Sequence, residues 1–107
     1  MKTESFSITT SDINISDKQL ILEGQLTIKN AASIKRDLLS ALDSSQSVIL
    51  VFKNVVKIDL SVLQLLVALQ KSAVLHNKKL SVDGELTGNV KSVLLNSGLQ
   101  KHIYTRN

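Results

Sequence analysis

The chain has 107 residues, a formal net charge of +4 and a composition that is 43% hydrophobic and 21% charged. These values are typical of a single soluble globular domain over residues 1–107, and they exclude a disordered or fibrous chain. The absence of cysteine excludes disulfide bonds, cysteine-based zinc sites and thiol catalysis. With two Phe, one Tyr and no Trp or Pro, the core is expected to consist of Leu, Val and Ile.

The basic residues are scattered along the chain rather than gathered in one run. The 13 Lys and Arg stand against 9 Asp and Glu, which indicates a solvated surface, and few aromatic side chains are present to stack on bases. We therefore expect no nucleic-acid partner. The first ten residues lack the apolar segment of a secretory signal, and no apolar stretch approaches the ~20 residues that span a bilayer. A cytoplasmic protein without direct membrane insertion is expected.

Two strands are expected first. Residues 5–10 alternate between polar and apolar side chains, and Ile13 and Ile15 continue this period of two. Residues 16–18 carry a turn signal, and a second strand is expected over residues 19–23, ending at Gly24. Together these segments predict an N-terminal hairpin.

A helix and a central strand follow. Apolar side chains at helical spacing predict a helix over residues 31–42, with Thr27 or Asn30 as its cap. Residues 48–52 are all apolar and mostly β-branched, so residues 47–53 are expected to form a strand buried on both faces. Strand, helix and strand in alternation indicate the α/β class.

The next segment is expected to be a loop over residues 54–58 that leads into a long helix from residue 62 to about 77. That helix is apolar over more than half of its circumference, so it must pack on the sheet and also on another element or a partner. A short strand over residues 79–83 and a third helix over 87–97 follow, closed by Gly98, with a last short strand at 103–104.

Patterns of catalytic or ligand-binding residues are absent from the sequence. His76 and His102 do not stand at a metal-ligand spacing, and neither a nucleophile-elbow motif nor a glycine-rich phosphate loop occurs. We therefore expect no enzyme, no metal and no cofactor.

The most informative segment begins at Asp59. An apolar strand and a short loop lead to an acid and then to Ser61 at a helix start. Ser61 with Gln64 three residues later fits a capping box, so one interpretation is that Ser61 only caps the helix and stabilises it by about 1 kcal/mol.

Several short segments also occur in an order and at a spacing that are typical of one family. They are LEGQLTI at 22–28, NAA at 30–32 with IK and LL after it, IDLSVLQLL at 58–66, KL at 79–80, VL at 93–94 and SGL at 97–99. Together they resemble a STAS domain, a superfamily that includes sulfate transporters and anti-sigma-factor antagonists, and most of all its stand-alone bacterial members. The resemblance implies a mixed β-sheet with helices on one side and a role in protein binding.

In the sigma-regulatory branch of that family, a kinase anti-sigma factor phosphorylates a serine or threonine at the start of the second helix. The resemblance places the motif's acid at Asp59, as a loop-shaping residue, and the phosphorylated residue at Ser61. Leu60 occupies a position that carries a hydroxyl in the family motif, Val62 replaces a glycine, and Thr27 replaces an acid before the first helix.

The first hypothesis is therefore a partner switch in signal transduction and transcription regulation, gated by phosphorylation of Ser61. Its expected partner is an anti-sigma factor or a serine-kinase-like regulator, bound on a face made by Leu60, Leu63, Gln64 and Val67. The alternative is a constitutive, non-phosphorylated STAS subunit of a larger assembly, such as a lipid ABC transporter or a chemotaxis-linked complex. The departures from the family motif favour this alternative.

Overall fold

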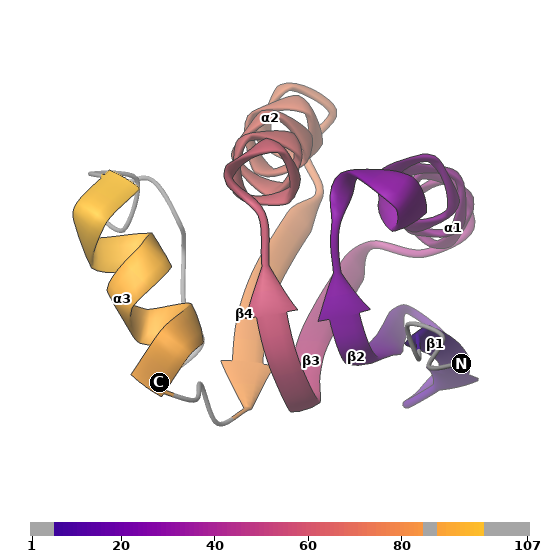
Figure 1. Cartoon of the computed structure of the whole chain (residues 1–107). Helices are drawn as coiled ribbons and strands as arrows, with labels where there is room; N and C mark the ends of the chain where they lie inside the picture. Colours follow the sequence, from indigo (N-terminus) through magenta and orange to yellow (C-terminus); the bar gives the residue numbers. More distant parts are fainter. Residues whose placement is uncertain (1–5, 85–87, 98–107) are drawn as a thin grey trace.

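A computed structural model describes residues 6–84 and 88–97 of the chain (Figure 1). The elements, in chain order, are β1 (Phe6–Asp12), β2 (Asp17–Leu26), the 3₁₀ turn η1 (Ile28–Asn30), α1 (Ala31–Asp43), β3 (Ser47–Ile58), α2 (Leu60–Leu75), β4 (Lys79–Gly84) and α3 (Gly88–Ser97).

The strands form one mixed sheet in the order β1-β2-β3-β4. β1 and β2 are antiparallel, whereas β2 with β3 and β3 with β4 are parallel. In Figure 1, α1 and α2 lie side by side over one face of this sheet, and α3 lies beyond β4. The expected α/β class and the mixed, helix-covered sheet are confirmed.

The core lies between the sheet and the helices and is aliphatic, as expected. Its largest fully buried members are Leu20, Leu22, Leu26, Ile34, Leu38, Val48, Leu50, Val55, Val62, Leu63, Leu66 and Val90. In β3, buried and partly buried residues alternate from Ser47 to Phe52. The prediction of a strand buried on both faces is therefore wrong, because the described helices α1 and α2 cover only one face.

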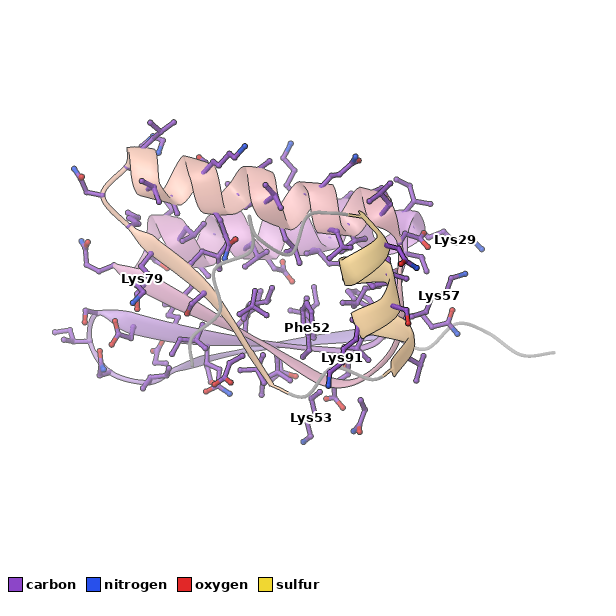
Figure 2. All side chains as sticks on the ribbon, turned by 90° about the vertical axis from the view of Figure 1, so that its left-hand side faces the viewer. Lys29, Phe52, Lys53, Lys57, Lys79 and Lys91 are labelled. Carbon is purple, nitrogen blue, oxygen red and sulfur yellow. The ribbon has the colours of Figure 1, made fainter. Side chains whose placement is uncertain are left out.

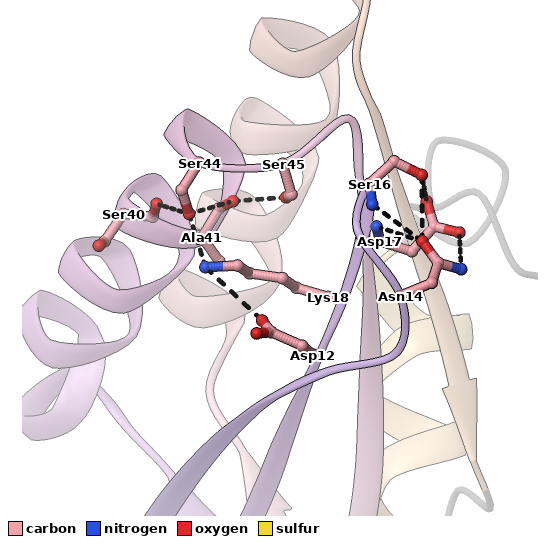
Figure 3. Close-up of polar contacts among 9 residues, drawn as sticks. All are labelled: Asp12, Asn14, Ser16, Asp17, Lys18, Ser40, Ala41, Ser44 and Ser45. Atoms are coloured by element: carbon pink, nitrogen blue, oxygen red, sulfur yellow. Dashed lines mark hydrogen bonds and ion pairs between the residues drawn. The ribbon is translucent and has the colours of Figure 1, made fainter.

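The N-terminal hairpin of β1 and β2 is confirmed, but its turn lies earlier than predicted, at residues 13–16. The Asn14 side-chain oxygen accepts hydrogen bonds from the backbone N–H groups of Ser16 (2.9 Å) and Asp17 (3.0 Å), as Figure 3 shows. This Asx turn interrupts the period of two, so Ile13 and Ile15 are exposed turn residues rather than strand residues. In the same view, the Lys18 ammonium donates to the Ser44 hydroxyl at 2.7 Å, which ties the hairpin to the end of α1.

β3 continues to Ile58 rather than ending at residue 53. An irregularity interrupts the pairing: Asn54 has a positive φ of 53°, Gly24 on β2 has a φ of 90°, and the register shifts on both sides of Gly24. After it, Val55 and Ile58 are buried again. The segment expected to be a loop is therefore strand, and it carries the chain to the start of α2.

The helices begin close to where the sequence places them. Asn30 is the N-cap of α1, although its side-chain amide donates to the Gln25 carbonyl (2.8 Å) rather than accepting from the helix. α2 begins at Leu60, earlier than predicted, and none of the described helices is long and apolar enough to cross a bilayer. The predicted start of the third helix at residue 87, its stop at Gly98 and the strand at 103–104 lie outside the described residues.

β4 pairs with β3 only as far as Gly84, opposite Phe52. Gly84 has a φ of +100°, and a Cβ there would lie 2.3 Å from the Phe52 carbonyl oxygen. On the side of β3 away from β2, the residues after Phe52 therefore pair with no strand among the described residues. α3 contacts β3.

Candidate functional site

Ser61 is the second residue of α2, at the end of the sheet where β2 and β3 finish. The helix N-cap is Asp59, whose backbone is extended (φ −87°, ψ 153°). The interpretation of Ser61 as the N-cap of a capping box is therefore wrong, because Ser61 already lies within the first helical turn. Its side chain is partly exposed.

Asp59 connects three elements at this point. Its Oδ2 accepts a hydrogen bond from the Ile28 N–H of η1 (3.0 Å), and its own N–H donates to the Leu26 carbonyl at the end of β2 (2.9 Å). Its carbonyl oxygen accepts the N–H groups of Val62 (3.0 Å) and Leu63 (3.2 Å) in α2. The loop-shaping role of Asp59 stays a prediction, and these contacts give it a physical basis.

The Asp59 carboxylate does not cap α2, since no side-chain hydrogen bond is made at this N-cap. Among the described residues, no acceptor meets the N–H groups of Leu60 and Ser61, and no partner meets the Ser61 hydroxyl. Unpaired N–H groups in a first helical turn, together with the helix dipole, favour a negative charge placed beside them. The Ser61 side chain is therefore in a position where added negative charge is stabilised.

The four residues of the predicted partner face are not all on the surface. Leu60 is 48% exposed and Gln64 is exposed, but Leu63 is only 2% exposed and Val67 only 8%. The prediction is wrong for Leu63 and Val67, because α2 packs not only over the sheet but also against α1 and α3. The wide apolar circumference of α2 is thus largely used inside the domain.

Two further exposed apolar residues are connected to this helix start, Ile28 through a backbone hydrogen bond and Val56 through a groove that it shares with Leu60. Ile28 is 64% exposed and is held by its hydrogen bond to Asp59, the residue before Leu60. Val56 is 52% exposed, and with Leu60 it lines a groove of about 570 Å³. We call Ile28, Val56 and Leu60 the α2 entry surface.

The groove is completed by residues from β3 and α3. It is lined by Val56, Lys57, Ile58, Asp59, Leu60, Ser92 and Val93. Residues 56–60 are contiguous, but no sequence signal joins them to Ser92 and Val93, which only the packing of α3 brings to this place. The groove is therefore a feature of the tertiary fold and could not be read from the motif alone.

No cluster of three or more His, Cys, Asp or Glu side chains suited to a metal ion occurs within residues 6–84 and 88–97. His76 is exposed at the end of α2, with its Nδ1 2.8 Å from the Ser72 carbonyl oxygen, and His102 lies outside the described residues.

Comparison with known proteins agrees with this arrangement of a mixed sheet covered by helices. A family model, the STAS domain, matches residues 11–107. The chain belongs to the STAS domain family. No curated protein matches the chain.

Solved structures resemble this STAS domain over most of its length. The anti-sigma factor antagonist SpoIIAA in its unphosphorylated form matches with a TM-score of 0.75 and 14% identity, over 94% of this chain and 89% of that one. The Bacillus cell fate determinant SpoIIAA in its phosphorylated form matches with a TM-score of 0.69 and 14% identity, over 94% and 92%. An anti-sigma factor antagonist from Mycobacterium paratuberculosis matches with a TM-score of 0.73 and 13% identity, over 95% and 87%. This STAS domain therefore has the fold of anti-sigma-factor antagonists.

Proposed function

We propose that this STAS domain is a cytoplasmic partner switch. It binds a protein partner at the α2 entry surface, and phosphorylation of Ser61 releases that partner. The observation that carries the proposal is the place of Ser61: a partly exposed hydroxyl in the first turn of α2, directly after the exposed Leu60.

The fold is expected to tolerate the modification. A phosphate on Ser61 adds about −1.5 to −2 charges at the positive end of a helix dipole. The N–H groups of Leu60 and Ser61, which have no acceptor among the described residues, are close enough in sequence to donate to it. Phosphorylation therefore changes the surface rather than the stability of the domain.

The partner is not expected to stay bound to the phosphorylated surface. A partner packed on Ile28, Val56 and Leu60 removes water from this surface, and an unpaired phosphate beside it would have to lose its hydration. Desolvating an unpaired charge costs far more than burying a few apolar side chains contributes. Phosphorylation of Ser61 is therefore expected to release the partner without unfolding the domain.

The class of partner is proposed from the relatives. The named structural neighbours are anti-sigma factor antagonists, so we propose an anti-sigma factor or a serine-kinase-like regulator, and a role in transcription regulation. The proposed activity is binding, with no catalytic residue, metal or cofactor supplied by this chain.

The experiment is a pull-down from native lysate with the wild type, Ser61→Ala and Ser61→Asp, with partners identified by mass spectrometry. Ser11→Asp is the matched control, because Ser11 is exposed on β1 and pairs with Gln19 near the start of β2, far along the strand from its end at Leu26. The partner is expected with the wild type, Ser61→Ala and Ser11→Asp, and not with Ser61→Asp.

Equal capture by all four proteins would overturn the switch. It would favour the constitutive subunit instead, and that alternative predicts co-purification with a larger assembly such as a membrane ATPase.

A further inference from the structure

Two basic side chains lie at the end of the domain that carries the α2 entry surface. Lys57 lines the groove and Lys29 follows Ile28 in η1; both are exposed. Figure 2 shows Lys29 and Lys57 at the same end of the domain, with Lys79 at the opposite end. Among the described residues that line the groove, Asp59 is the one acid, and one of its oxygens already accepts the Ile28 N–H. Lys57 on the groove and Lys29 at the same end of the domain therefore place positive charge beside it.

The floor of the groove is apolar. Val56 and Leu60 line it, with the partly buried Val93 from α3. The exposed Ile28 donates its backbone N–H to the groove residue Asp59. Aliphatic side chains do not provide the stacking platforms on which single-stranded nucleic acids bind. A concave groove admits a protruding side chain, whereas a bilayer surface is contacted by protruding residues. A protein segment is the occupant that fits both the apolar floor and the positive charge beside it.

Resting on the proposed function, we infer that the partner presents an acidic segment to this surface, with an apolar side chain in the groove and carboxylates opposite Lys29 and Lys57. Complementary charge of this kind speeds association and sets specificity. The same lysines explain why phosphorylation would act strongly here. A phosphate on Ser61 would compete for them and would repel the acidic segment.

The inference is tested with a displayed library of random 12-residue peptides selected on the wild-type protein. The selected peptides are then titrated against the charge-reversed variant Lys29→Glu/Lys57→Glu and against the matched control Lys71→Glu/Lys79→Glu. Both control residues are exposed, and Lys79 lies at the far end of the domain (Figure 2). NMR shifts of Ile28, Val56, Leu60 and Val93 locate the bound peptide, and thermal melts show that both variants are folded.

The expected result is a set of peptides rich in Asp and Glu with one or two large apolar residues. Their affinity is expected to fall at least tenfold with Lys29→Glu/Lys57→Glu, less than twofold with the control, and several-fold when salt rises from 50 to 500 mM. Selection of neutral or basic peptides, selection of no acidic peptide, or NMR shifts at another surface would overturn the inference. So would binding of phosphatidylserine vesicles or a single-stranded 20-mer DNA in place of acidic peptides.

The failure of this inference is distinguishable from the failure of the switch. If an acidic peptide binds Ser61→Asp as tightly as the wild type, the docking chemistry stands and gating by Ser61 is wrong. If Ser61→Asp releases the partner in the pull-down but no peptide depends on Lys29 and Lys57, the gating stands and the acidic partner is wrong.

Discussion

Replacing Asp59 tests how the start of α2 is held against η1. Asp59→Ala removes the acceptor of the Ile28 N–H, whereas Asp59→Asn keeps an acceptor oxygen and removes only the charge. The backbone contacts of residue 59 with Leu26, Val62 and Leu63 are made by main-chain atoms, so both variants keep them. The pair of variants therefore separates the hydrogen bond from the charge.

The expected magnitude follows from the contacts. A hydrogen bond to a charged group contributes about 1.5–3 kcal/mol, and the low end applies because this one is exposed. A negative charge near a helix N-terminus contributes about 0.3–1 kcal/mol more. The usual loss on removing an N-cap side chain does not apply, because this carboxylate accepts no hydrogen bond from α2. We therefore expect Asp59→Ala to lower the free energy of unfolding by about 2 kcal/mol and Asp59→Asn by about 1 kcal/mol.

Urea denaturation measures both values. With a denaturant slope of about 2 kcal/mol/M, Asp59→Ala shifts the midpoint by about 1 M at an unchanged slope. Hydrogen exchange of the Ile28 amide should accelerate in the alanine variant more than in the asparagine variant. Asp43→Ala, which removes an exposed acid at the end of α1, is the control and should change stability by less than about 0.5 kcal/mol. Equal stabilities of the alanine variant and the wild type, or no difference between alanine and asparagine, would refute the reasoning.

Two further pairs of variants test the burial and backbone assignments. Leu63→Ala should cost about 2–5 kcal/mol of unfolding free energy in urea, because Leu63 is 2% exposed. Leu60→Ala, at 48% exposure, should cost less than about 0.5 kcal/mol yet weaken partner capture; equal costs for the two would contradict the division between core and surface. Gly84→Ala should destabilise by about 1–3 kcal/mol in a thermal melt, because φ is +100° and the new Cβ would meet the Phe52 carbonyl. Gly88→Ala, a helical glycine with nothing within 4 Å of its Cβ, should be neutral or stabilising, and a loss of stability as large as that of Gly84→Ala would count against the close approach.

The sequence predicts most of the fold because its hydrophobic patterns are regular where the elements are regular. The apolar run at residues 48–52, the helical spacing before it and the long apolar helix after it each correspond to one element of the sheet or to a helix that covers it. The pattern is misleading where the backbone departs from ideal geometry. At Asn54, the positive φ and the register shift break the alternation, so the rest of β3 looks like a loop.

The candidate site is predictable only in part for a related reason. Asp59 and Ser61 are found from the motif, but which of them caps α2 depends on a difference of two residues that pattern alone does not resolve. Leu63 and Val67 share helical spacing with Leu60 and Gln64, yet the packing of α1 and α3 against α2 decides which of them reach the surface. The groove between β3 and α3 depends on tertiary packing and has no local signal.

Gating by Ser61 is the central claim, and it is tested most directly with the protein phosphorylated at that one residue. The partner captured by the wild type would be titrated calorimetrically with unmodified and Ser61-phosphorylated protein, and the thermal stability of both forms would be compared. The account predicts that phosphorylation weakens binding by at least tenfold while the melting temperature changes little. Equal affinity for both forms, or weaker binding that merely follows unfolding of the phosphorylated domain, would contradict it.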